Sequence, residues 1–187
     1  MAYCSSGYIF GPLNSRRFGR SLGIDVSGGK KQCNFDCLYC ELGKSKKVSS
    51  YSDIVSPQVI INELRSVIVD LKNIDVITIS ANGEPTLYPY LNEIIDEVNV
   101  LKIGINAKSL ILSNSSMIIN NQIRQILNKF DIVKLSLDSA TESGFKKLDR
   151  PIENIKIDEI IEGMIAFSQE FKGELVVEVL FIKNIKR

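Results

Sequence analysis

The sequence contains no histidine and no tryptophan, and only four of its 187 residues are cysteine. Without an imidazole, the chain cannot build a Ser-His or Cys-His nucleophile, a histidine zinc site or a haem site with a proximal histidine. No apolar run approaches the ~18 residues that span a bilayer, and the N-terminus lacks a basic segment followed by an apolar one. We therefore expect a cytoplasmic protein with no membrane partner. Its chemistry must depend on cysteine, carboxylate, lysine, backbone groups or a cofactor.

The length and composition predict one globular domain over residues 1–187, with an N-terminal arm at 1–21 and the main fold at 22–187. The net charge is +1, but residues 1–50 hold eight Lys and Arg against three Asp and Glu. This local excess can steer an anionic partner such as tRNA or a phosphorylated substrate. A solvated basic loop explains the same excess, so both interpretations stay open.

Short runs rich in Val and Ile alternate with longer segments of helical periodicity. The expected strands are Leu22–Val26, Asp75–Ser80, Ser109–Leu112, Ile132–Leu137 and Glu174–Ile182; the expected helices begin at Pro57 or cover Tyr90–Leu101, Asn120–Lys129 and Ile157–Phe171. This alternation predicts an α/β fold with parallel strands. Because a complete eight-fold barrel takes ~250 residues, we expect a partial (β/α) TIM-type barrel that is truncated after about the fifth strand. The uncovered edge of the last strand predicts self-association.

Three cysteines, Cys33, Cys37 and Cys40, have the spacing C-x3-C-x2-C. Thiolates this close together in a reducing compartment favour metal binding over disulfides. A zinc or electron-transfer site would need a fourth ligand, which only Cys4 could supply. A cubane iron–sulfur cluster held by three thiolates would instead leave one iron without a protein ligand, open for chemistry.

The motif CNFDCLYC resembles the C-x3-C-x-aromatic-C signature of the radical S-adenosylmethionine (SAM) enzymes, with Tyr39 as the aromatic residue. The resemblance implies a [4Fe-4S] cluster on Cys33, Cys37 and Cys40 whose open iron chelates the methionine moiety of SAM. It also implies an external reductant, such as flavodoxin or ferredoxin. In that family, reductive cleavage of SAM yields methionine and a 5′-deoxyadenosyl radical, which abstracts hydrogen from a substrate.

The segment ANGEPT, which follows the second expected strand, resembles the GGEP motif of the same family. The resemblance implies that Asn82, Gly83, Glu84 and Pro85 line the cofactor site and that the turn receives the ammonium group of the substrate. Glu84 and nearby carbonyl groups can accept charge-assisted hydrogen bonds from such a cation. Asn82 replaces the first glycine of the motif.

Two further polar segments follow expected strands, at the end where barrel active sites form. Ser113 and Asn114 resemble the Ser/Thr-Asn segment near the cofactor. Ser136 and Asp138 match positions that contact the ribose or the methionine carboxylate in many relatives. In isolation, each segment would also fit an ordinary cap or turn.

The segment before the cysteines and the later LDRP at residues 148–151 resemble the tRNA wyosine synthase-like subgroup, which makes a tRNA base the suggested substrate. Arg16, Arg17 and Arg20 are candidates for anion binding, although they would equally serve to pair with carboxylates and pin the arm across the barrel. A glycyl-radical activating enzyme and a non-catalytic iron–sulfur electron-transfer or regulatory protein remain the alternative functions.

Overall fold

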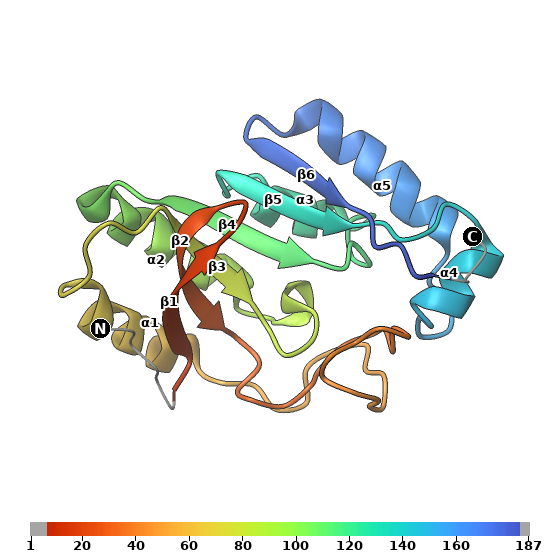
Figure 1. Cartoon of the computed structure of the whole chain (residues 1–187), viewed down its shortest axis with the longest axis horizontal. Coiled ribbons are helices and arrows are strands. Elements are labelled where there is room, and N and C mark those ends of the chain that lie inside the picture. The colour runs from red at the N-terminus through yellow and green to blue at the C-terminus, as the bar shows by residue number, and fades with distance from the viewer. Residues whose placement is uncertain (1–6, 184–187) are drawn as a thin grey trace.

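The computed structural model describes residues 7–183. Six strands and five α-helices alternate along most of the chain (Figure 1). The strands are β1 (Ile9–Ser15), β2 (Gly19–Asp25), β3 (Val76–Ser80), β4 (Lys108–Ser113), β5 (Ile132–Ser136) and β6 (Glu174–Glu178). The helices are α1 (Pro57–Ile68), α2 (Leu91–Leu101), α3 (Asn121–Leu127), α4 (Glu142–Leu148) and α5 (Ile157–Glu170), with 3-10 turns η1 (Pro85–Leu87) and η2 (Lys102–Ile105).

All six strands form one sheet in the order β1-β2-β3-β4-β5-β6. Strands β2 to β6 are parallel, and β1 pairs antiparallel with β2. The five parallel strands confirm the expected partial (β/α) barrel. The described part of the expected N-terminal arm, residues 7–21, contains β1, the hairpin turn and the first residues of β2, so it belongs to the sheet.

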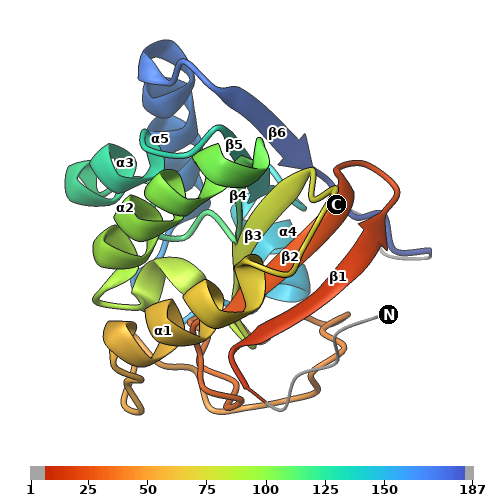
Figure 2. The same ribbon diagram turned by 90° about the vertical axis from the view of Figure 1, so that its left-hand side faces the viewer.

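Four helices, α1, α2, α3 and α5, pack on one face of the sheet (Figure 2). Pro57 occupies the first turn of α1, where its missing N–H costs nothing, and Ile60, Leu64 and Val67 on one side of that helix are buried. Their partners in the core include Ile77 and Ile79 of β3, which are fully buried. None of the helices within residues 7–183 has the length and apolar composition needed to cross a membrane.

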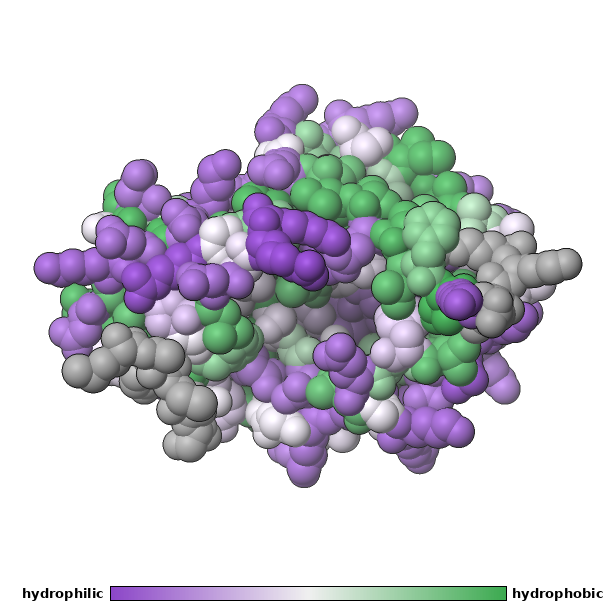
Figure 3. Space-filling model, viewed as in Figure 1, coloured by the Kyte–Doolittle hydropathy of each residue, from purple (hydrophilic) through white to green (hydrophobic). Residues whose placement is uncertain are grey.

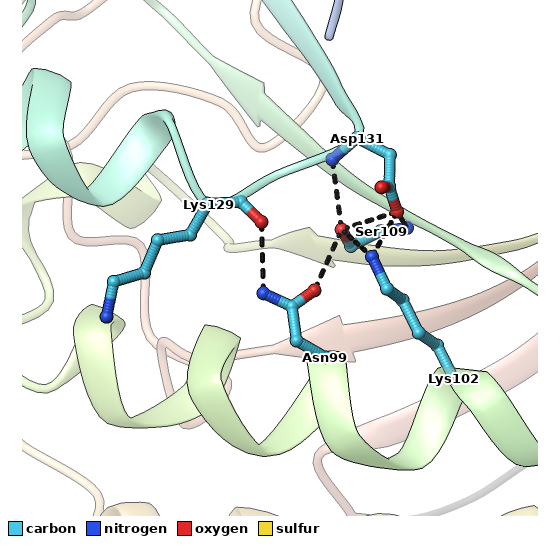
Figure 4. Close-up of polar contacts among 5 residues, drawn as sticks. All are labelled: Asn99, Lys102, Ser109, Lys129 and Asp131. Atoms are coloured by element: carbon cyan, nitrogen blue, oxygen red, sulfur yellow. Dashed lines mark hydrogen bonds and ion pairs between the residues drawn. The ribbon is translucent and has the colours of Figure 1, made fainter. Parts of the chain in front are cut away.

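The amino ends of the strands carry a polar network rather than the candidate site (Figure 4). The carboxylate of Asp131 accepts hydrogen bonds from Ser109 N at 2.7 Å and from Lys102 Nζ. Asn99 of α2 donates to the carbonyl oxygen of Lys129 at 3.0 Å, which ties that helix to the segment before β5. In barrel folds this end of the sheet contributes stability, while the carboxyl end carries the chemistry.

Candidate functional site

The cysteines lie in the long loop between β2 and α1, residues 26–56, which passes along the carboxyl edge of the sheet towards α4 (Figure 1). Cys33 is buried, while Cys37 and Cys40 are half-buried, and all three are free thiols. Cys4, the expected fourth ligand of the alternative site, lies outside the described residues.

Gly83, in the turn after β3, lies against the backbone of Gln32, which directly precedes Cys33. Gln32 N donates to the Asn82 carbonyl oxygen at 2.8 Å, and Glu84 N donates to the Gln32 carbonyl oxygen at 3.0 Å. Gly83 has φ +142°, and a Cβ at this position would overlap the Gln32 backbone. Only glycine fits both the backbone angle and the close approach. The expected GGEP-like turn therefore holds the cysteine loop by its backbone.

A second backbone clamp comes from residues 148–152, which comprise the LDRP segment at the end of α4 and the following Ile152. Leu38 N donates to the Leu148 carbonyl oxygen at 2.7 Å, and Ile152 N donates to the Asn34 carbonyl oxygen at 2.7 Å. These two hydrogen bonds flank Cys37. The resemblance singled out LDRP without giving it a role; in the structure, it fixes the path of the cysteine loop.

The environment of the thiols disfavours their charged form. Burial, followed by the negative charge of Glu84, raises the pKa of Cys33 to about 11. The pKa of Cys37 is raised by burial, then by the charge of Asp149, and also by the charges of Cys33 and Cys40. Bound iron would supply the positive charge that stabilises thiolates. Among residues 7–183, no group of three or more His, Cys, Asp or Glu side chains is arranged to hold a single metal ion. In a cubane cluster, by contrast, each thiolate ligates a different iron, and this donor set fits that chemistry.

Glu84 is fully buried, and both oxygens of its carboxylate accept hydrogen bonds. One oxygen accepts from Thr86 N at 3.0 Å and from Ser113 Oγ at 2.8 Å, while the other accepts from Asn114 N at 2.6 Å. Burial raises the pKa of Glu84, and these hydrogen bonds oppose the increase. The carboxylate therefore joins the turn after β3 to the end of β4. Contrary to our expectation, it is not exposed to accept a hydrogen bond from an incoming ammonium group.

Asn82, which replaces the first glycine of the motif, is anchored to β2. Its side-chain amide donates to Asp25 Oδ2 at 2.9 Å, and its backbone N donates to Ser27 Oγ at 3.0 Å. Asp25 Oδ1 accepts in turn from Ser27 N at 2.8 Å. The replacement thus adds a link between the ends of β2 and β3.

Five of the expected site residues, Cys37, Tyr39, Asn114, Ser136 and Asp138, line one small cavity of about 40 Å³. Within it, the Tyr39 hydroxyl donates to Asp138 Oδ2, and Asp138 Oδ1 accepts from Leu180 N at 2.7 Å. A cavity of this size has room for about one water molecule. The structure thus gathers these side chains at one place, with the Asp138 carboxylate engaged by protein groups.

Asp149 joins the same cavity, although the sequence did not suggest it as a site residue. Its carboxylate accepts from the Cys37 thiol at 3.7 Å, and the same oxygen lies 3.5 Å from the Tyr39 hydroxyl oxygen. Burial, together with the charge of Asp138, raises the pKa of Asp149 to about 7. The only sequence signal for this residue was its place in LDRP.

The three expected anion-binding arginines separate in the structure. Arg16 and Arg17, at the tip of the β1–β2 hairpin, line a cavity on the inner face of the sheet, which is the face opposite helices α1, α2, α3 and α5 (Figure 2). Arg20 does not line this cavity. Arg17 also forms an ion pair with Glu178 of β6. The expected carboxylate pairing is therefore present for Arg17.

The parallel β/α sheet carries a three-cysteine loop after its first parallel strand, and a glycine turn holds that loop through backbone hydrogen bonds. Together these features define the radical SAM class. The family described as the Radical SAM superfamily matches residues 31–185. The chain belongs to the radical SAM superfamily.

The relatives by sequence include the UPF0026 protein of Helicobacter pylori strain 26695, which is 46% identical over 178 residues. The match covers 95% of this chain and 57% of that protein. An S-adenosylmethionine-dependent nucleotide dehydratase of the Thermoplasmatales archaeon ISO4-H5 is 31% identical over 136 residues, covering 72% of this chain and 43% of that protein. The chain therefore spans about half the length of the curated relatives that it matches.

Solved structures share the fold at low sequence identity. Streptococcus suis SuiB bound to S-adenosylmethionine has a TM-score of 0.65 at 19% identity, covering 87% of this chain and 34% of SuiB. TYW1 with a lysine-pyruvate adduct has a TM-score of 0.56 at 16% identity, covering 88% of this chain and 56% of TYW1.

Proposed function

We propose that this chain is a radical SAM enzyme that holds one [4Fe-4S] cluster through Cys33, Cys37 and Cys40. The observation that carries the proposal is the double backbone clamp on the cysteine loop. The turn at Gly83 holds the loop at Gln32, and residues 148–152 hold it on both sides of Cys37. Such rigid support positions metal ligands before the metal arrives.

When bound, the cluster supplies the electron that cleaves SAM to methionine and a 5′-deoxyadenosyl radical. The protein's own groups bind and orient the cofactor. Because the Glu84 carboxylate is occupied, we assign the ammonium group of SAM to the backbone carbonyls of the Asn82–Pro85 turn. Glu84 then acts as a positioning residue, since it fixes that turn to Ser113 and Asn114.

We assign Ser136 and Asp138 to the ribose or the methionine carboxylate of SAM. Asp138 is only 4% exposed, and Tyr39 now holds one of its oxygens. SAM binding at this position requires the Tyr39 side chain to release Asp138. Tyr39 is 37% exposed, so it is the more accessible member of this pair.

The partners proposed for this enzyme are a one-electron reductant, such as flavodoxin or ferredoxin, and a substrate to be identified. The resemblance suggests a tRNA base, whereas one relative is named as a nucleotide dehydratase. A glycyl-radical activating enzyme would act on a protein backbone instead. Purification from cells separates these options, because a tRNA substrate predicts co-purifying RNA and the glycyl-radical alternative predicts a co-purifying protein.

Iron and sulfide analysis tests the cluster. After anaerobic reconstitution, we expect about four irons per chain. Replacing Cys33, Cys37 or Cys40 with Ser should abolish cluster binding, while Cys4→Ser should leave it intact. Iron loss in Cys4→Ser would instead support a four-thiolate site, and a loaded chain that yields no 5′-deoxyadenosine from SAM would support the non-catalytic alternative.

Cytoplasmic location and self-association stay predictions. Three free thiols suit a reducing compartment. β6 is the last strand in the sheet order, and Val177, at 46% exposure, is one of its apolar residues facing solvent. Light scattering over a range of protein concentrations tests the association, and a monomer at every concentration would contradict it.

A further inference from the structure

The inner face of the sheet lines an open cavity of about 430 Å³, far larger than the one beside Cys37. Its lining comes from β1 to β6 and from the hairpin tip at Arg16–Phe18. It reaches Ser80, Leu112 and Glu178, which lie at the carboxyl ends of their strands, next to the candidate site. Figure 3 shows the molecule hollowed near the middle of this face. The volume is in the range of small-molecule sites.

The charges in this cavity are unbalanced. Its lining includes three cations, Arg16, Arg17 and Lys134, and one carboxylate, Glu178. Arg17 and Lys134 both form ion pairs with Glu178. The Lys134 side chain is only 15% exposed, which places this cation largely inside the protein. A concave site with excess positive charge concentrates anions.

The remaining walls are apolar or carry hydroxyl groups. Leu110 and Leu112 of β4 and Phe10 and Phe18 of the hairpin line the cavity, and Thr78 of β3 contributes a hydroxyl. Apolar walls with a few placed polar groups are typical of sites for organic molecules with a flat or apolar ring. Guanidinium and ammonium groups suit carboxylate and phosphate oxygens.

We propose that this cavity binds the substrate of the enzyme, and that the substrate is a small organic anion, at most the size of a mononucleotide, with a ring against β4 and an anionic group at Lys134 and Arg17. Glu178 occupies the place of that anionic group when the substrate is absent. This inference rests on the proposed function for its role in catalysis, but the binding itself requires neither cluster nor SAM.

Calorimetric titration of the chain without cluster tests the proposal. The probes are uridine 5′-monophosphate, which carries a phosphate, benzoate, which carries a carboxylate, and uridine, which is uncharged. Comparing their affinities shows which anionic group binds and whether the charge is needed. We expect saturable binding of at least one anion and at least about tenfold weaker binding of uridine. The reason is that losing one hydrogen bond to a charged group costs about 1.5 kcal/mol or more, which is about tenfold in affinity.

Variants assign the binding to the cavity. Lys134→Met and Arg17→Gln should each weaken anion binding about tenfold, whereas Glu178→Gln should strengthen it several-fold because a competing carboxylate is removed. Arg20→Gln is the matched control on the same hairpin and should bind as the unchanged chain does. Circular dichroism verifies that each variant is folded. The expected increase in anion affinity for Glu178→Gln is a further test, because a misfolded variant would not bind the anion more tightly.

Three results would overturn the proposal: no binding of either anion, binding of uridine as tight as that of the anion that binds, or anion affinity that Lys134→Met and Glu178→Gln leave unchanged. If one of these results is found but the reconstituted chain still forms 5′-deoxyadenosine from SAM, only the anionic substrate is rejected and the proposed function stands. Anion binding without 5′-deoxyadenosine would reject the function instead.

Discussion

Gly83 and Gln32 form a backbone bridge that joins the turn after β3 to the residue directly before Cys33. The bridge tolerates no side chain on Gly83. We predict that Gly83→Ala lowers the free energy of unfolding by about 1–3 kcal/mol, since alanine disfavours φ +142° and its Cβ displaces Gln32. Displacement of Gln32 also displaces the adjacent Cys33, so the iron content after reconstitution should fall as well. Urea unfolding and iron analysis measure the two effects.

Gly104→Ala is the control for that substitution, since no non-neighbouring heavy atom lies within 4 Å of the position that its Cβ would take. Its stability and iron content should match those of the unchanged chain. Equal iron content in Gly83→Ala and Gly104→Ala would show that the turn does not position the cysteine loop.

We predict that Glu84→Gln destabilises the fold by about 2–3 kcal/mol, because the amide cannot reproduce a carboxylate that accepts from Ser113 and the backbone of Asn114. Glu162, on the exposed side of α5, provides the control, and Glu162→Gln should change stability by less than about 0.5 kcal/mol. Thermal unfolding monitored by circular dichroism compares the two. Similar melting temperatures would contradict the assignment of Glu84 as a structural link.

The amino-end network predicts an acid-dependent contribution from Asp131. Burial raises the pKa of Asp131, but hydrogen bonds from Lys102 and Ser109 outweigh it and hold the pKa below its usual value. A lowered folded-state pKa stabilises the protein above the unfolded-state pKa of ~3.9, and this stability is lost as pH falls through the folded-state value.

Asp131→Asn should therefore cost about 1 kcal/mol at pH 7, a modest figure because the side chain is partly exposed. The difference from the unchanged chain should shrink as the pH falls below ~4. Asp70→Asn, at the exposed end of α1, is the control and should show no such trend. Urea unfolding at a series of pH values measures both, and a difference that grows in acid would contradict the sign of the pKa shift.

The periodic parts of the chain predicted the fold well. The five parallel strands and four of the helices lie where the Val and Ile runs and the helical periodicity placed them, within a few residues. The last strand ends at Glu178 rather than Ile182. Strand β1 was missed because Gly11 and Pro12 interrupt its pattern and its register shifts between Phe10 and Leu13. Helix α4 was missed because it has only seven residues, including Gly144, which is too short a segment to show a period.

The candidate site could be predicted by residue type but not by contact. The cysteine spacing identified the loop, yet one of its two backbone clamps comes from Leu148 and Ile152, more than a hundred residues away along the chain. The Glu84 carboxylate accepts hydrogen bonds from Ser113 and Asn114 because the carboxyl ends of β3 and β4 lie next to each other. No local sequence pattern encodes that proximity. The pairing of Lys134 with Glu178 similarly depends on the register of β5 and β6.

In the proposed site, three thiolates leave one iron of the cluster open to SAM. Electron paramagnetic resonance of the anaerobically reconstituted and reduced chain, recorded before and after SAM is added, measures whether SAM reaches that iron. We expect a changed cluster signal on addition of SAM, accompanied by 5′-deoxyadenosine, and no cluster signal in Cys37→Ser. An unaltered signal with no cleavage product would contradict the proposed open iron.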